Sequence, residues 1–164
     1  MQGSITQASE LAVSVLLSLA LRGRNAAVTP RQIAEDIGAS PAYTAKVCRQ
    51  LVRCHILRSQ RGAAGGVRLE RSPENVTLLE IVAACQGSLL ASACNDVTDM
   101  HAACGYHLAV HALHGAITAT LSKWTLRDLL VQPHPLLPPG TEGHCLISRT
   151  WAAALKGEPQ SNSG

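Results

Sequence analysis

The sequence predicts a mainly α-helical fold with one small β-hairpin. The chain of 164 residues is 46% hydrophobic yet contains only two Trp, two Tyr and no Phe. Its core must therefore consist of Leu, Ile, Val and Ala, which suits packed helices. Two helix-start patterns, Thr29-Pro30 and Ser40-Pro41, stand close together, and a glycine-rich segment with flanking arginines follows over residues 58–67. Two short helices followed by a basic hairpin have the layout of a winged helix-turn-helix.

The first helix is predicted from Ser4 or Thr6, either of which can cap it, to about Arg22. Its apolar run over residues 11–21 is too short to span a bilayer. Glu10 precedes this run where a signal peptide would have a basic region, and no small-residue cleavage site follows it. We therefore expect a cytoplasmic protein with no membrane partner. In such a protein the six cysteines are better interpreted as thiols or metal ligands than as disulfides.

The next two helices are predicted from their caps. Thr29-Pro30-Arg31-Gln32 is a capping-box pattern with Pro at the first helical position, and Gly38 is expected to end that helix. Ser40-Pro41 begins the following helix in the same way, after a turn of three residues. Two helices joined this tightly indicate a helix-turn-helix.

The second helix of this pair is predicted to have one polar and one buried face. Its polar face carries side chains suited to reading a DNA groove, namely Tyr43, Lys46, Gln50 and Arg53. Its opposite face is supplied by Val47, Leu51 and Val52. Two strands, Ile56–Ser59 and Val67–Leu69, are then expected on either side of the glycine-rich turn.

In the rest of the chain, a segment without hydrophobic periodicity separates one predicted helix from two others. Thr77 to Glu80 form another capping-box pattern, which opens a helix to about Cys85 with Gly87 as its stop. A long helix is expected from about Cys104 to Lys123, and residues 125–131 form a last short helical piece. The long apolar helix is the natural dimer contact. The predicted organisation is a DNA-binding domain over 1–86, a cysteine-containing sensor loop over 87–103, a dimerisation helix region over 104–131 and a Pro-rich, mobile tail over 132–164.

Positive charge is concentrated in the part of the chain that holds the predicted helix-turn-helix and hairpin. Residues 22–71 contain ten of the fourteen Lys and Arg but only three acidic residues, a balance of +7, whereas the remaining four basic and eight acidic residues give −4. A local excess of this size suits phosphate binding, in which each neutralised phosphate releases counterions. A solvated surface of mixed charge pairs is the alternative.

These motifs, in this order and spacing, resemble a known family. The resemblance extends from about Ile5 to Val131, and the sequence is similar to the IscR and NsrR family of bacterial winged-helix regulators, the Rrf family. It rests on five segments: Ile33-Ala34-Glu35 with Ser40-Pro41-Ala42-Tyr43, Gln50-Leu51-Val52-Arg53, Arg61-Gly62 with Gly65-Gly66, Leu78-Leu79-Glu80-Ile81-Val82, and Thr125-Leu126-Arg127-Asp128-Leu129. The resemblance implies a homodimer that binds an imperfect palindrome of double-stranded DNA, nucleoid-associated when bound, and that carries an iron–sulfur cluster controlling DNA affinity.

The resemblance also implies roles for particular residues. The recognition helix falls on residues 40–53, with Tyr43 and Thr44 near the DNA backbone or bases, and Arg61 is the wing arginine that enters the minor groove. That groove has an enhanced negative potential, which attracts a guanidinium. Tyr43 could instead pack against the preceding helix. The predicted DNA-binding residues are Ser40, Tyr43, Thr44, Lys46, Arg49, Gln50, Arg53 and Arg61.

The candidate metal ligands depart from the pattern of cluster-bearing relatives. Those relatives have three cysteines in the loop before the long helix, whereas this loop has only Cys94 and Cys104. Cys104-Gly105-Tyr106-His107 matches their Cys-x-x-His motif, and this spacing puts both side chains on one face of the helix start. Glu10 falls where NsrR-like relatives place an acidic ligand from the other subunit. We expect Cys94, Cys104, His107 and Glu10 to hold a 2Fe–2S cluster, because histidine replaces cysteine in known cluster types.

Several alternatives to a cluster stay open. The Cys104 and His107 side chains could be part of a zinc site, Cys94 and Cys104 could form a reversible thiol switch, or the loop could bind nothing. His111 and His114 could add ligands but more often such residues line a helix interface. The other cysteines on the helices, Cys48, Cys54 and Cys85, are expected to be buried or half-buried hydrophobic residues.

The sequence thus favours a dimeric transcriptional repressor that senses redox state, nitric oxide or iron–sulfur status. A regulator of the same fold without a cluster, controlled by thiol oxidation, zinc or a small ligand, is the alternative. A cysteine hydrolase using Cys104 and His107 is a remote third, because the chain has no recognisable oxyanion loop. We expect no enzyme activity.

Overall fold

The computed structural model describes residues 6–23, 26–62, 65–87 and 104–131, together with Ile147 and Thr150. The predicted sensor loop, including Cys94, therefore lies outside the described residues, except for Gly87. The predicted tail also lies outside them, apart from Ile147 and Thr150, and Ile147 packs against the core. The proposed division into domains stays a prediction.

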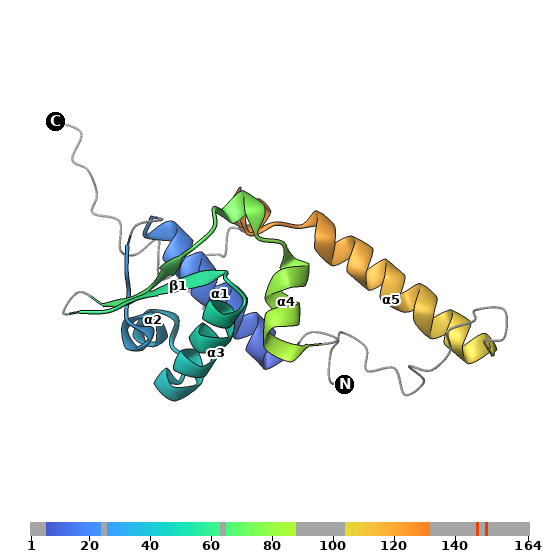
Figure 1. The fold of residues 1–164 in the computed structure, drawn as a ribbon, viewed down its shortest axis with the longest axis horizontal. Helices are drawn as coiled ribbons and strands as arrows, with labels where there is room; N and C mark the ends of the chain where they lie inside the picture. The colour runs from blue at the N-terminus through green and yellow to red at the C-terminus, as the bar shows by residue number, and fades with distance from the viewer. Residues whose placement is uncertain are drawn as a thin grey trace, which may run out of the picture.

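Helix α1 (Gln7–Leu21) runs through the centre of the molecule. The Thr6 side chain caps it by accepting a hydrogen bond from the Ser9 backbone N–H. Ten of its fifteen residues are buried, including a continuous run from Leu11 to Leu19. A helix that is apolar on nearly every face must be covered on every face. Helices α2, α3, α4 and α6 all pack against it (Figure 1).

Helices α2 (Pro30–Ile37) and α3 (Pro41–Arg53) form the predicted helix-turn-helix. The Thr29 capping box with Gln32 is present, and Gly38 ends α2 in the left-handed conformation at φ 66°. The short turn after Gly38 brings α3 back against α2, and both helices pack on α1. One detail differs from the prediction: Ser40 is the N-cap of α3 by position, but its side chain makes no capping hydrogen bond.

The wing is an antiparallel hairpin of β1 (Leu57–Gln60) and β2 (Gly66–Leu69). Strand β1 is displaced by one residue from its expected bounds, whereas β2 begins one residue earlier than expected and ends at Leu69 as predicted. Val28 forms an additional bridge to Val67, with hydrogen bonds of 3.0 and 2.9 Å in the two directions. This bridge requires glycine at the neighbouring position, because a Cβ on Gly66 would lie 2.5 Å from the Val28 carbonyl oxygen. The wing is thereby fixed to the segment that precedes α2.

A short 3-10 turn (Pro73–Asn75), which the sequence did not predict, leads to α4 (Leu78–Gln86). The capping box of Thr77 with Glu80 begins α4, and Gly87 ends it, as predicted. Helix α5 (Gly105–Lys123) has Cys104 as its N-cap and is followed by α6 (Leu126–Val131).

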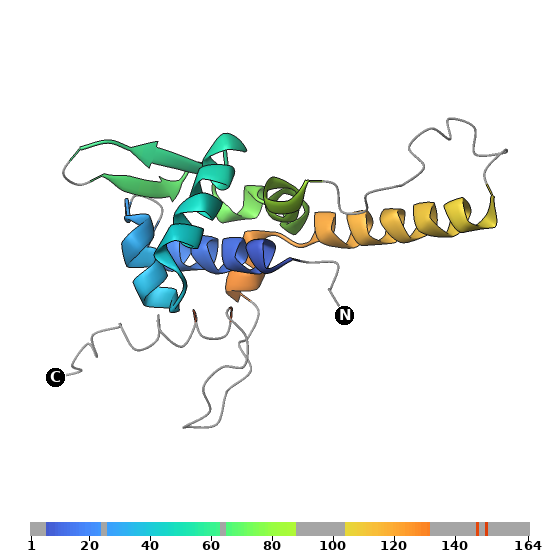
Figure 2. The same ribbon diagram turned by 90° about the horizontal axis from the view of Figure 1, so that it is seen from below.

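The long helix α5 projects from the body like an arm (Figures 1 and 2). At its base α5 packs against α4, and two backbone hydrogen bonds of 2.8 Å join the segments beside it, from Leu78 N–H to the Trp124 carbonyl and from Leu126 N–H to the Val76 carbonyl. Along α5 itself only Leu121 is buried. No helix in the described part of the chain has the length and hydropathy needed to cross a membrane.

Candidate DNA-binding surface and metal ligands

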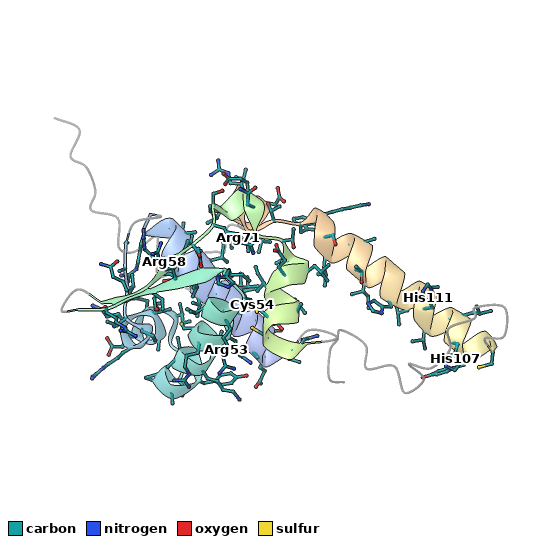
Figure 3. All side chains as sticks on the ribbon, viewed as in Figure 1. Arg53, Cys54, Arg58, Arg71, His107 and His111 are labelled. Carbon is teal, nitrogen blue, oxygen red and sulfur yellow. The ribbon has the colours of Figure 1, made fainter. Side chains whose placement is uncertain are left out.

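The outer face of α3, with its N-cap, carries four of the eight predicted DNA-binding residues. Ser40, Lys46, Arg49 and Arg53 are exposed, while Val47, Cys48 and Leu51 face the core. Spacings of three and four residues put the exposed side chains on a common helix surface. Figure 3 shows Arg53 at the C-terminal end of this helix, away from the arm.

Three predicted contacts on α3 differ in their exposure. Tyr43 is half-buried and packs against the core, which agrees with the alternative interpretation of this residue. Gln50 is also half-buried. Thr44 is 0% exposed, and its hydroxyl has no hydrogen-bond partner within the described residues. Thr44 therefore lies on the core side of α3 and not on the outer face with Lys46, and its contact with DNA stays a prediction.

The wing adds further arginines. Arg58 on β1 and Arg61 just beyond it are exposed, and Arg68 on β2, which pairs with Arg58 across the hairpin, is half-exposed. The hairpin turn is tight, since a Cβ on Gly65 would lie 2.7 Å from the Gly62 carbonyl oxygen. Sequence reasoning did not include Arg58 and Arg68 among the DNA-binding residues, although their cross-strand pairing follows from the hairpin register.

The ion pairs show which basic side chains of residues 22–71 have an acidic partner among the described residues and which do not. Arg22 pairs with Asp36, Arg31 with Glu35 at 3.0 Å, and Arg71 with Glu80 at 2.7 Å. No ion pair is recorded in the described residues for the other basic side chains of this region, which are Lys46, Arg49, Arg53, Arg58, Arg61 and Arg68. Like charges kept together without acidic partners repel one another unless an anion binds between them. Since all six lie on α3 or the wing, this surface is suited to phosphates rather than to mixed pairing.

At the far end of α5 the structure brings together two of the four predicted metal ligands. The Cys104 Sγ lies 3.1 Å from the His107 Nδ1 (Figure 3 shows His107 at this end of the arm). Hydrogen bonds from the His107 backbone N–H and the His107 side chain lower the pKa of the exposed Cys104 thiol to about 7. A thiolate is the form of cysteine that ligates metals. The His107 Nε2 is buried and has no hydrogen-bond partner in the described part of the chain.

The other two predicted ligands are not brought to this point. Cys94 lies outside the described residues, and Glu10 is exposed in the first turn of α1, on the body of the molecule. The start of α1 lies on the body, whereas the Cys104 end of α5 is the end of that helix far from the body (Figure 1). Among the described residues of one chain, no three His, Cys, Asp or Glu side chains converge on a common point. The described residues of one chain therefore do not bring Glu10 to Cys104.

The fold and the basic surface together define a winged helix-turn-helix DNA-binding protein. The family model of Rrf2, described as an iron-dependent transcriptional regulator, matches residues 5–132. The chain belongs to this family of transcriptional regulators, which confirms the resemblance that the sequence motifs indicated.

The similarity extends over most of the chain. The transcriptional regulator NsrR of Bacillus subtilis is 28% identical over 130 residues, which cover 77% of this chain and 89% of that protein. IscR of Photobacterium profundum is 27% identical over 128 residues, covering 77% of this chain and 74% of that protein. The structure of a transcriptional regulator from Listeria innocua has a TM-score of 0.63 at 26% identity, covering 85% of this chain and 95% of that one. These relatives are regulators, so the prediction that the chain is not an enzyme is confirmed and a cysteine hydrolase is set aside.

Proposed function

We propose that this regulator is a homodimeric, sequence-specific repressor that binds imperfect palindromes and responds to redox state, nitric oxide or iron–sulfur status. The observation that carries the DNA-binding part is the set of six basic side chains on α3 and the wing that have no acidic partner among the described residues. In this proposal α3 lies in the major groove, where Lys46, Arg49, Gln50 and Arg53 meet bases and phosphates, and Arg61 reaches the adjacent minor groove.

Dimerisation is proposed from the exposed apolar residues of α5. Tyr106, Leu108 and Leu113 are 72%, 47% and 52% exposed on a helix that projects from the body. The helix has 19 residues and is therefore roughly 28 Å long at 1.5 Å per residue. Apolar surface of this extent is typical of an interface, and a second α5 has the same length and composition. A two-fold axis at α5 would present two copies of α3, which matches a palindrome with half-sites about one helical turn apart.

Light scattering after size-exclusion chromatography tests the dimer. The wild-type chain is expected to have twice the monomer mass, and a Leu113→Glu variant is expected to be monomeric at micromolar concentration. Ser122→Glu, an exposed polar position on the same helix, is the matched control. A monomeric wild-type protein would overturn this part of the proposal.

For the sensing site, the donor chemistry of Cys104 and His107 fits an iron–sulfur or zinc ligand pair. The Cys104 thiol, whose pKa is about 7, contacts the His107 Nδ1, and the other ring nitrogen, Nε2, has no hydrogen-bond partner among the described residues. We propose that Cys94 completes the pair within one chain and that Glu10 of the partner subunit supplies the fourth ligand. A bound 2Fe–2S cluster would supply a reversible one-electron couple. This chain's own contribution is to hold both donors at the first turn of α5, the helix proposed to form the dimer contact.

The alternative is a regulator of the same fold without a cluster, controlled by thiol oxidation, zinc or a small ligand. It is favoured by the absence of a third cysteine from the loop and by the exposed Cys104 thiol, whose low pKa makes it reactive without any metal.

Anaerobic purification with a visible spectrum and iron and sulfide assays separates the two. About two irons and two sulfides per chain are expected for the cluster, with loss of colour in Cys104→Ala. Colourless, iron-free protein after reconstitution would leave the alternative. DNA binding is tested separately by selection from random duplexes, in which enrichment of an inverted repeat is expected. The absence of any enriched sequence would contradict sequence-specific binding.

A further inference from the structure

Two arginines stand directly opposite each other on the wing. Arg58 on β1 is the register partner of Arg68 on β2. The backbone N–H and carbonyl of Val67 both bond to Val28, so Val67 is not in a hydrogen-bonded pair with β1. Because hydrogen-bonded and non-hydrogen-bonded pairs alternate along an antiparallel ladder, Arg58 and Arg68 form a hydrogen-bonded pair, with Cα atoms about 5.5 Å apart. Their side chains leave the hairpin on the same face.

The two arginines lie on the outer face of the hairpin. Leu57, Val67 and Leu69, which flank the pair along the strands, are buried, so the opposite face packs against the core. Arg58 is exposed and Arg68 is half-exposed, and Figure 3 shows Arg58 on the wing. Two long side chains that start this close together on one exposed face can bring both guanidinium groups to a single point outside the hairpin.

This pair of arginines carries two positive charges with no counter-charge beside them. Like charges directly opposite each other destabilise a sheet. In the part of the chain that the structure describes, neither arginine has an ion pair, and the carboxylate of Glu70, two residues after Arg68, lies 3.7 Å from the His55 Nδ1 instead. An anion held between the two guanidinium groups would offset their repulsion. A phosphate suits this position, because the planar fork of N–H donors on each guanidinium matches phosphate oxygens.

The position of the pair relative to Arg61 fits the geometry of a DNA groove. Arg61 directly follows β1 and is the residue proposed to enter the minor groove. At about 3.3 Å per residue of extended chain, Arg58 lies up to about 10 Å behind Arg61. A minor groove is about 7.5 Å deep. When the Arg61 guanidinium is at the floor of the groove, the pair is therefore at its edge, where the backbone phosphates lie.

We propose that Arg58 and Arg68 together bind one phosphate of the DNA backbone, at the edge of the minor groove that Arg61 enters. This contact is separate from those of α3 and reads no base. It fixes how deeply the wing enters the groove, because the phosphate holds the base of the hairpin at one height. The inference deepens the proposed function and rests on it.

Replacement of single phosphates by uncharged methylphosphonates in a selected duplex tests the contact. One linkage in each half-site is replaced at a time, and the affinity of the full-length protein is measured by fluorescence anisotropy. The wild-type protein is expected to bind about tenfold more weakly when a particular phosphate at the edge of the minor groove is replaced. Arg58→Gln and Arg68→Gln are each expected to bind the unmodified duplex more weakly and to lose their sensitivity at that same phosphate.

Arg31→Gln is the matched control, because Arg31 is exposed but paired with Glu35, and it should keep the wild-type profile. If Arg58→Gln and Arg68→Gln lose sensitivity at two different phosphates, the arginines do not share one and the proposal is wrong. It is equally wrong if both variants keep the complete wild-type profile.

Melting of the DNA-free protein, in sodium phosphate and in sodium chloride of equal ionic strength, gives a second readout. Phosphate is expected to raise the melting temperature of the wild-type protein and of Arg31→Gln more than that of Arg68→Gln. In chloride, Arg68→Gln should melt no lower than the wild-type protein, because the substitution removes a repulsion between like charges. An equal effect of phosphate on Arg68→Gln, or a lower melting temperature of this variant in chloride, would contradict the proposal. If the protein binds no selected duplex, the proposed function fails, while the melting experiment still decides whether the two arginines hold an anion.

Discussion

Substitution of Arg53 by Ala is expected to reduce the salt dependence of DNA binding. Arg53 is exposed at the end of α3 and has no ion pair among the described residues, so its charge is available to a phosphate. Each phosphate contact contributes about 0.9 to the slope of log affinity against log salt concentration. A dimer would lose two contacts, so the slope should fall in magnitude by about 1.8. Between 50 and 200 mM salt, the wild-type affinity should therefore drop about tenfold more than that of the variant.

Fluorescence anisotropy on one selected duplex, titrated at four or more salt concentrations, gives both slopes. Arg31→Ala is the matched control, because Arg31 is equally charged and exposed but is paired with Glu35 on α2. Its slope should equal that of the wild-type protein. The reasoning is refuted if Arg53→Ala keeps the wild-type slope, or if Arg31→Ala reduces the slope as much as Arg53→Ala does.

Three further outcomes are expected. Gly66→Ala should lower the free energy of unfolding by about 1–3 kcal/mol in urea, because its Cβ would meet the Val28 carbonyl; unchanged stability would contradict the tight approach. Burial raises the pKa of Glu80, but the Thr77 backbone N–H and the side chain of Arg71 outweigh it and lower the pKa from 4.5. Stability from this group is complete above pH 4.5 and is lost as pH falls below it, so a Glu80→Gln variant should show a flatter loss of melting temperature toward acid pH than the wild-type protein. In metal-free protein, iodoacetamide should alkylate Cys104 with a half-maximal rate near pH 7 and little reaction below it; a midpoint near 9 would show that the hydrogen bonds from His107 are absent in solution.

The helices and the wing could be predicted from local sequence because their ends depend on side chains nearby in the chain. The Thr29 and Thr77 capping boxes each join residues three apart in the chain, and Gly38 ends α2 through its own left-handed backbone. All three helix ends fall where the sequence indicated. The bounds of the strands differ by one residue, at both ends of β1 and at the start of β2, because pairing across the hairpin and the bridge from Val28, which is distant in the sequence, decide them. The junction of Thr77 with Thr125 was not foreseen for the same reason.

The exposure of the candidate DNA-binding residues could be predicted where the type of side chain decides it. It could not be predicted where the packing of helices decides it. Lys46, Arg49 and Arg53 are exposed because a long charged side chain is costly to bury. Thr44 and Tyr43 have small or amphipathic side chains that can face either way, and the contact of α3 with α1 and α2 decides their burial.

The distance between the basic surface and the Cys104 end of α5 sets a requirement for any signal between them. The arm leaves the body at two backbone hydrogen bonds, from Leu78 to Trp124 and from Leu126 to Val76. Beside this junction, the capping carboxylate Glu80 also holds Arg71, which follows the wing strand β2. A change in the angle of α5 would therefore reach both the start of α4 and the base of the wing. If Cys104 is part of the proposed sensing site, a signal there would need no contact with DNA. A change in the position of α5 relative to the body would be enough to alter how the wing and α3 are presented.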